Sequence, residues 1–286
     1  VLVVAMGAGA ILRAHGAAQP AMWSTIGGAV VNAVLDPILI TGASSGIGAA
    51  VALAYAQRYG QGGCTLALSG RDADRLQAVA TACRASGAIV SATVIDVTDQ
   101  AAMRQWISDA DTAAPLDIVL ANAGISGGED EATTRRIFDI SLTGVLNTVH
   151  PALDCMIARG HGTIGMVSSI AGNRGLPSAP AYSAAKAAVL AYGEGLRGRS
   201  AHRGVAICVI CPGFVRSRIT DQNTFSMPFF MEADRAAQII LTGLNKGTAK
   251  ISFPWQMRCI GWILRALPSG LGTRLLSRLP QKELRG

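Results

Sequence analysis

The chain has 286 residues, of which 50% are hydrophobic and 15% are charged, so it can bury a large core and is neither disordered nor fibrous. Its formal net charge of +7 resides in residues 246–286, which hold eight Lys and Arg and a single Glu. This distribution argues against a nucleic-acid surface spread over the chain, and leaves a basic tail that is either solvated or in contact with a membrane or partner subunit.

The first forty residues contain two apolar stretches, 1–12 and 21–40, and polar residues interrupt both before either reaches the roughly 20 residues of a membrane span. The segment 20–40, which includes GGAVVNAVLDPILI, resembles a transmembrane segment of multidrug-and-toxin extrusion (MATE) transporters. The ILI of 38–40 also suits an enzyme, so it marks a junction. We interpret residues 1–37 as a transporter-like extension, fused or mis-assembled onto an enzyme, that cannot transport by itself because such transporters need many helices.

A short β-type run over 38–41 leads into TGASSGIG, and a helical pattern follows over 49–58. Dinucleotide folds use this succession, since glycines allow the tight turn and backbone N–H groups at the helix start face a pyrophosphate. Such turns also occur without ligands, so later features must support the assignment. The loop residues predicted to bind a cofactor are Gly42, Ser44, Ser45, Gly46, Ile47 and Gly48.

A second β run over 65–69 ends in Gly70 and Arg71, about 20 residues past the loop, where a dinucleotide fold places the residue that contacts the adenosine ribose. An acidic residue there would favour NAD. The Arg71 guanidinium can instead bind a 2′-phosphate through two hydrogen bonds, so we predict NADP(H), with NAD(H) as the alternative. Asp72 could contact a ribose hydroxyl, but its place directly before an Ala/Leu/Val helix favours an N-cap.

Two further strands are expected to end at the same edge of a parallel sheet. Residues 94–97 end the third strand, and 118–120 form the fourth, which runs into Ala-Asn-Ala-Gly. We expect Asp96 to accept a hydrogen bond from the adenine amine, and the neighbouring cofactor-binding residues to be Val97, Asn122, Ala123 and Gly124. Ordinary turn chemistry is the alternative for the Asn and Gly residues.

A fifth strand over 162–167 ends in two serines, and Tyr182 follows thirteen residues after Ser169. Lys186 lies four residues further on, and AAKAAVLAYGEGL predicts a helix over 183–200, so the ammonium is expected beside the phenol on one face. We expect this neighbour to lower the pKa of the Tyr182 phenol, as general acid–base catalysis near neutral pH needs.

Five motifs thus follow one another: TGASSGIG, the NAG of 122–124, Ser169, the YSAAK that begins at Tyr182 and the CPGFV of 211–215. In this order they resemble the short-chain dehydrogenase/reductase (SDR) family over about residues 38–255. The resemblance implies an enzyme that transfers hydride between a nicotinamide and a small-molecule carbonyl or secondary alcohol. It also implies a homodimer or homotetramer. Six scattered cysteines suit a reducing compartment, so we expect a cytoplasmic protein.

By that resemblance Tyr182 exchanges a proton with the substrate oxygen, Ser169 hydrogen-bonds this oxygen, and Lys186 binds the nicotinamide ribose. The wall near the nicotinamide would consist of Pro212, Gly213, Phe214, Val215 and Ser217. One departure concerns Ser141, where family members usually have an Asn that holds a water of the proton relay. A Ser hydroxyl could hold a water at another distance, so we expect altered or reduced turnover rather than none.

Two segments are expected to flank the substrate pocket. The first contains Asn173, Arg174, Leu176 and Pro177, and the second is the loop 214–231, with Phe225, Met227, Pro228, Phe229, Phe230 and Met231. Their apolar character favours a hydrophobic alcohol or ketone, although the same residues could pack as a lid. Cys208 and Cys211 lie in an apolar run without a second Cys pair, so we interpret them as free core thiols and predict no metal site.

A helix over 232–245 and a last strand over 250–254 precede a basic amphipathic extension, 256–286, for which peripheral membrane contact, dimer packing and a substrate lid remain alternatives. The predicted architecture is a doubly wound α/β sheet of about seven parallel strands, in a Rossmann-type domain over 38–255 with apolar extensions at both ends. A catalytically weak NAD(P)-binding module and a membrane-associated fragment are the rival functions. Ser169, Tyr182 and Lys186 argue against the first, because a pure binding module needs no acid–base group.

Overall fold

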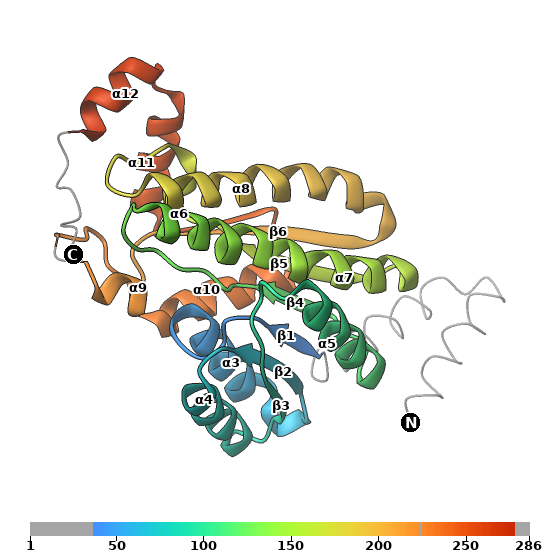
Figure 1. Cartoon of the computed structure of the whole chain (residues 1–286). Helices are drawn as coiled ribbons and strands as arrows, with labels where there is room; N and C mark the ends of the chain where they lie inside the picture. The colour runs from blue at the N-terminus through green and yellow to red at the C-terminus, as the bar shows by residue number, and fades with distance from the viewer. Residues whose placement is uncertain (1–36, 224, 278–286) are drawn as a thin grey trace.

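Seven parallel strands form the framework of the protein, in a computed structural model that describes residues 37–223 and 225–277. Their order across the sheet is β3-β2-β1-β4-β5-β6-β7 (Figure 1). They are β1 (Ile38–Ile40), β2 (Thr65–Gly70), β3 (Ile89–Val94), β4 (Ile118–Ala121), β5 (Gly162–Val167), β6 (Val205–Pro212) and β7 (Lys250–Phe253). The order reverses between β1 and β4, which confirms the predicted doubly wound sheet.

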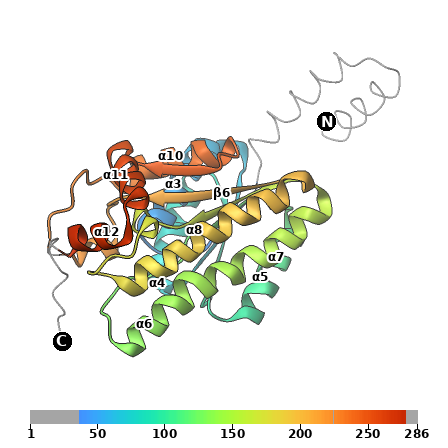
Figure 2. The ribbon, with the colours of Figure 1, turned by 90° about the horizontal axis from the view of Figure 1, so that it is seen from above.

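Helices cover both faces of the sheet (Figure 2). One face carries α3 (Gly46–Tyr59), α4 (Ala73–Ala85) and α10 (Ala233–Asn245), and the other carries α5 (Gln100–Ala113), α7 (Gly144–Arg159) and α8 (Pro180–Ser200). The shorter elements are η1 (Gly60–Gly62), α6 (Glu131–Phe138), the π-helical turn η2 (Asp139–Thr143), η3 (Ile170–Asn173), η4 (Ala201–Arg203), α9 (Arg218–Asp221), α11 (Trp255–Ala266) and α12 (Ser269–Leu276).

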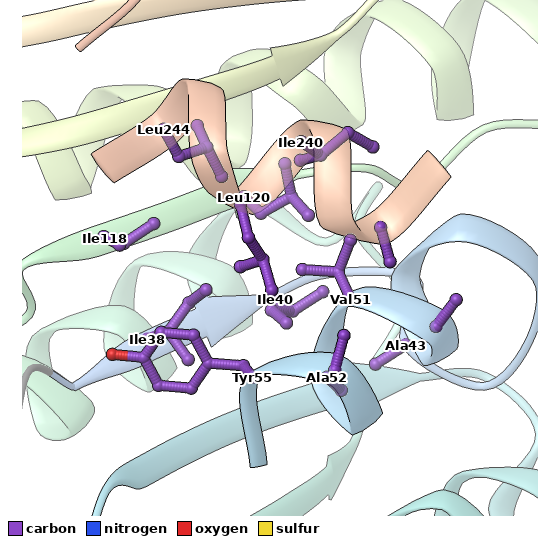
Figure 3. Close-up of a cluster of buried hydrophobic side chains, with 14 of the residues drawn as sticks. Ile38, Ile40, Ala43, Val51, Ala52, Tyr55, Ile118, Leu120, Ile240 and Leu244 are labelled. Atoms are coloured by element: carbon purple, nitrogen blue, oxygen red, sulfur yellow. The ribbon is translucent and has the colours of Figure 1, made fainter. Parts of the chain in front are cut away.

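The central strand β1 shows how the sequence produces these layers. Its three residues are fully buried, and successive side chains of a strand point to opposite faces. Ile38 and Ile40 pack with Val51 of α3 and Ile240 of α10 (Figure 3), whereas Leu39 belongs to the cluster under α5 and α7. An apolar run without alternation is typical of a parallel strand covered on both sides. It places the loop after Ile40 at the carboxyl edge of the sheet.

One detail differs from the predicted elements. The third strand ends at Val94 rather than Val97, because the Asp96 carboxylate accepts a hydrogen bond from the Thr98 N–H at 2.9 Å and turns the chain there. Cys208 and Cys211 do lie buried in β6, as core residues. Residues 1–36 of the predicted transporter-like segment lie outside the described part of the chain.

Helices α11 and α12 lie beyond β7, at the edge of the sheet opposite to β3 (Figure 1). Arg174, in the loop after η3, donates to the carbonyl oxygens of Leu264 at 2.8 Å and Leu267 at 2.6 Å, and so fixes the end of α11. Within 37–223 and 225–277, no helix is both long enough and apolar enough to cross a bilayer.

Candidate active site

A cavity of about 540 Å³ at the carboxyl edge of the sheet brings most of the predicted site together. The predicted residues that line it are Gly42, Ser44, Ser45, Gly46, Ile47, Arg71, Val97, Asn122, Ala123, Gly124, Ser169, Tyr182, Lys186, Pro212, Gly213, Val215 and Ser217. Within the described part of the chain, Gly48, Asp96, Ser141 and Phe214 are not among its lining residues. The cavity thus joins the glycine loop to the Ser-Tyr-Lys group.

The glycine loop brings the start of α3 to the cavity. Gly42 and Gly46 adopt φ values of +66° and +59°, a region that side chains disfavour. A Cβ atom on Gly48 would lie 2.4 Å from the Gly42 carbonyl oxygen, so only glycine fits beneath the turn. The N-cap Ser45 makes no side-chain cap hydrogen bond, and the first turn of α3 holds no acidic residue. The positive helix end is therefore uncompensated on the protein side, which fits a dinucleotide pyrophosphate.

Asn122 holds this loop rather than facing the cavity with a free amide. Its Nδ2 donates to the carbonyl oxygens of Thr41 and Gly42, each at 3.1 Å, and its backbone N–H donates to Thr41 Oγ1 at 3.1 Å. These bonds join the ends of β1 and β4. The predicted contact of Asn122 with an adenosine ribose stays a prediction, because the amide donors are directed at the loop.

Two arginines line the cavity where β2 ends. Arg71 follows the strand directly, and Arg75 lies one helical turn further on, in α4. Asp72 accepts from the Arg75 N–H at 3.0 Å, which confirms it as the N-cap, and its other oxygen lies 2.6 Å from the Arg75 guanidinium. Sequence reasoning missed Arg75, although its position four residues after Arg71 on a predicted helix was the available signal.

Asp96 lies beside Arg71 instead of lining the cavity. Its carboxylate accepts from the Thr98 hydroxyl at 2.9 Å and lies 3.8 Å from the Arg71 guanidinium. Burial opposes ionisation of this carboxylate, but the Thr98 hydrogen bonds and the charges of Arg71 and Arg136 lower the pKa of Asp96 overall. Asp96 is therefore an ionised partner of Arg71 at neutral pH, and its predicted contact with an adenine stays a prediction.

Ser169 and Tyr182 both line the cavity, and the Ser169 hydroxyl acts on the Tyr182 phenol. Ser169 caps η3, because its Oγ accepts from the Ala171 N–H at 3.1 Å, and its hydroxyl donates to the Pro212 carbonyl oxygen at 3.5 Å. Burial raises the pKa of the Tyr182 phenol, and the hydrogen bond with Ser169 offsets part of that increase. The prediction that Lys186 lowers the phenol pKa is wrong for this structure, because burial outweighs the interactions that favour phenolate.

Lys186 is almost fully buried, with 3% of its surface exposed, although it carries an amine. The amine donates to the Val167 carbonyl oxygen at 2.9 Å and lies over the Tyr182 ring, 5.8 Å from the centroid. Gly124 makes room for it, since a Cβ there would lie 3.1 Å from Lys186 Nζ. Burial lowers the pKa of Lys186 to about 8, so the amine can change charge within a mildly basic range.

Ser141 lies fully buried in η2, next to this group. Its hydroxyl accepts from the Ile125 N–H at 3.1 Å and donates to the Ile125 carbonyl oxygen at 3.3 Å. The single O–H donor is therefore occupied by the backbone after β4, and one acceptor lone pair is left over. A role in holding a relay water stays a prediction, while the structural role of Ser141 is to tie η2 to Ile125.

Of the two segments predicted to flank the substrate pocket, only part of the second, between Val215 and Gln222, lines the cavity. The cavity lining contains neither residues 173–177 nor residues 225–231 among those described. Arg174 is occupied with α11, and Leu176 and Pro177 line a second cavity of about 430 Å³. Residues 218–220 and Gln222, which belong to the predicted loop 214–231, line the main cavity. These residues belong to α9, whose start is marked by a capping box between Ser217 and Thr220. That pair was the weak sequence signal for this helix.

Comparison with known proteins agrees with this geometry. Residues 36–226 match the family described as short chain dehydrogenase. An "Uncharacterized oxidoreductase" of Myxococcus xanthus is 38% identical over 247 residues, which cover 84% of this chain and 96% of that protein. Another, Rv0945 of Mycobacterium tuberculosis, is 29% identical over 227 residues, or 76% of this chain and 88% of that protein. A short-chain dehydrogenase from Sphingobium yanoikuyae, solved in complex with NADPH, has a TM-score of 0.71 and 27% identity, and covers 87% of this chain and 98% of its own.

The buried amine predicts a pH dependence of stability. Below pH about 8 the folded protein must carry the charged Lys186 in a buried place, whereas an unfolded chain keeps the amine charged up to its ordinary pKa of 10.5. Stability of the wild type relative to Lys186→Met should therefore rise as the pH increases from about 8 to 10.5. Urea unfolding at several pH values measures it, with exposed Lys246→Met as the control for losing an amine. If the free energy of unfolding of the wild type relative to Lys186→Met stays constant or falls over this pH window, the assigned cost of burying the charged amine is contradicted.

Proposed function

The chain belongs to the short chain dehydrogenase family, and from that premise we propose that it is an NADP(H)-dependent oxidoreductase that acts on the carbonyl or secondary alcohol group of an apolar small molecule. The observation that carries the proposal is the placement of Ser169, Tyr182 and Lys186 in the same cavity as the glycine loop. A fixed acid–base group beside a dinucleotide-shaped cavity has a chemical use that a binding module lacks.

The bound nicotinamide supplies or accepts the hydride. In the reducing direction Tyr182 donates the phenolic proton to the carbonyl oxygen, and its raised pKa keeps that proton in place at neutral pH. Ser169 holds the same oxygen through its hydroxyl, whose Oγ accepts from the Ala171 N–H. Lys186 keeps one N–H on the Val167 carbonyl, and its other two are available for a ribose hydroxyl.

The preference for NADP(H) rests on Arg71 and Arg75. Both residues line the cavity past the end of β2, where an adenosine ribose would lie, and two guanidinium groups suit a 2′-phosphate. Asp72, which could otherwise bind a ribose 2′-hydroxyl and favour NAD, is occupied by the Arg75 N–H and guanidinium. The NADPH bound by the Sphingobium yanoikuyae enzyme adds support by analogy.

An apolar substrate is supported by Ile125, which packs against the same cluster as Tyr182 and also lines the cavity. Residues 38–255 are assigned to the catalytic domain, and residues 256–286 to an extension. Assembly as a homodimer or homotetramer remains a prediction of the family resemblance.

Replacement of the proton donor tests the proposed reaction. Tyr182→Phe should reduce NADPH-dependent turnover of apolar ketones and aldehydes by about 10²-fold or more, because the phenolic proton is lost, while NADPH affinity changes little. Tyr192→Phe is the matched control, since Tyr192 lies on the same helix but pairs with His150 at 3.3 Å. Full turnover in Tyr182→Phe would contradict the assigned role, and tight NADPH binding without turnover of any carbonyl by the wild type would favour a binding module.

The two arginines give a separate prediction for the cofactor. Arg75→Gln should weaken NADPH binding about tenfold or more and leave NADH binding nearly unchanged, because one charged contact to the 2′-phosphate disappears. Isothermal titration of both nucleotides measures the change. Arg84→Gln, in the last turn of the same helix, is the control. Equal losses for both nucleotides would show that Arg75 acts on the fold rather than on the phosphate.

A further inference from the structure

Helix α11 is apolar on two opposite faces, and one of them has no cover in the described structure. The inner face packs through Met257 against Ile170 of η3 and Leu190 of α8, and Gly261 is buried against Asn173. The outer face presents Trp255 and Trp262, whose exposed fractions are 65% and 72%. Exposing two tryptophans on one helix is unusual for a surface that meets water alone.

Helix α12 repeats this arrangement. Gly272 and Leu276 are buried, one helical turn apart, and Gly272 approaches the guanidinium of Arg174 so closely that a Cβ would lie 2.6 Å from Cζ. Leu271 and Leu275 occupy the outward side, with exposed fractions of 56% and 51%. The two helices occupy one corner of the molecule, past the β7 edge (Figures 1 and 2). Their outward side chains Trp255, Trp262, Ile263, Leu271 and Leu275 are called the outer apolar face below.

The charges around the outer apolar face have one sign. Arg258, Arg265 and Arg274 lie on the same two helices, and the sequence holds no Asp or Glu between Asp234 and Glu283. Glu194 of α8 lies 3.8 Å from Arg265. Within 37–223 and 225–277, neither Arg258 nor Arg274 has an acidic partner within ion-pair distance. Among the described residues, two guanidinium groups without an acidic partner therefore accompany the apolar side chains.

This combination fits a lipid surface better than a second copy of the chain. In a two-fold symmetric contact the same patch meets itself, so Arg258 and Arg274 would face a second patch whose charged side chains on α11 and α12, among the described residues, are all basic. Anionic lipid headgroups supply that missing charge, and tryptophan is favoured at the boundary between headgroups and acyl chains. Exposed leucine and isoleucine side chains then enter the acyl region.

We propose that the outer apolar face of α11 and α12 docks peripherally on an anionic phospholipid bilayer. The proposal is independent of the reaction assigned above. Because α11 packs on η3, which begins directly after Ser169, the contact would place the bilayer beside one wall of the candidate active site. An apolar substrate dissolved in the membrane would then be close to the cavity.

Vesicle co-sedimentation of the purified full chain tests the proposal without using activity. Phosphatidylcholine vesicles are compared with vesicles that also contain phosphatidylserine, at low and at high salt. We expect binding to the anionic vesicles that salt weakens. Trp255→Gln with Trp262→Gln should lower the bound fraction about tenfold or more, and Arg258→Gln with Arg274→Gln should weaken binding about fivefold per arginine.

The control variant is Ile89→Gln with Val94→Gln, which removes two equally exposed apolar side chains from β3, at the opposite edge of the sheet. It should bind as the wild type does. Trp255→Phe with Trp262→Phe keeps the face apolar, so this variant should retain binding but lose most of the fluorescence quenching by brominated phosphatidylcholine in the same anionic vesicles. This variant keeps the test decisive if the glutamine variants fail to fold.

Three results would overturn the proposal. The first is no binding of the wild type to anionic vesicles. The second is unchanged binding of the folded Trp255/Trp262 variant, which would assign the contact to another part of the chain, such as residues 1–36. The third is a lipid-free dimer, seen by analytical ultracentrifugation, that dissociates in the Trp255/Trp262 variant, since a second copy would then cover the face.

Discussion

Hydrogen bonds between the carboxyl ends of β1 and β4 are the constraint on which the candidate site depends. The Asn122 amide binds the carbonyl oxygens of Thr41 and Gly42, and the Thr41 hydroxyl accepts the Asn122 N–H. Gly48 packs against the Gly42 carbonyl oxygen and the Asn122 amide, with no room for a side chain. This contact fixes where α3 begins, and therefore where its positive end faces the cavity. The reacting groups further along the cavity can act only on a cofactor that this loop holds in place.

The second constraint is burial of the groups that would move the proton. Burial raises the pKa of Tyr182 above its ordinary value of 10.0 and lowers that of Lys186 from 10.5 to about 8, so it moves the two values apart. Ser169 ties the tyrosine to η3, and the Val167 carbonyl ties the lysine to β5. Because all three partners come from the end of one strand and one helix, the geometry of the group follows from the packing of α8 on β5 and β6.

The sequence was sufficient for the fold and for most of the site, since both follow local patterns. Apolar runs without alternation predict a covered parallel sheet, and the tyrosine and lysine share one turn of a helix. The sequence was insufficient where the partner of a side chain depends on long-range contacts. The occupation of the Asn122 amide by the loop, the Ser141 hydroxyl by Ile125 and Arg174 by α11 depends on segments far apart in the chain. The sign of the Tyr182 pKa shift was missed for the same reason, because the burial of a side chain is a property of the whole fold.

The most direct test of the assigned chemistry follows one atom. The purified protein would be incubated with NADPH that carries deuterium at both positions of the nicotinamide C4 and with a panel of apolar ketones and aldehydes, and the products would be examined by mass spectrometry. We expect deuterium on the carbinol carbon of at least one product. The rate of this transfer should be higher than the rate with equally labelled NADH. Tight NADPH binding with no transfer of deuterium to any carbonyl would contradict the assigned chemistry and leave a nucleotide-binding module.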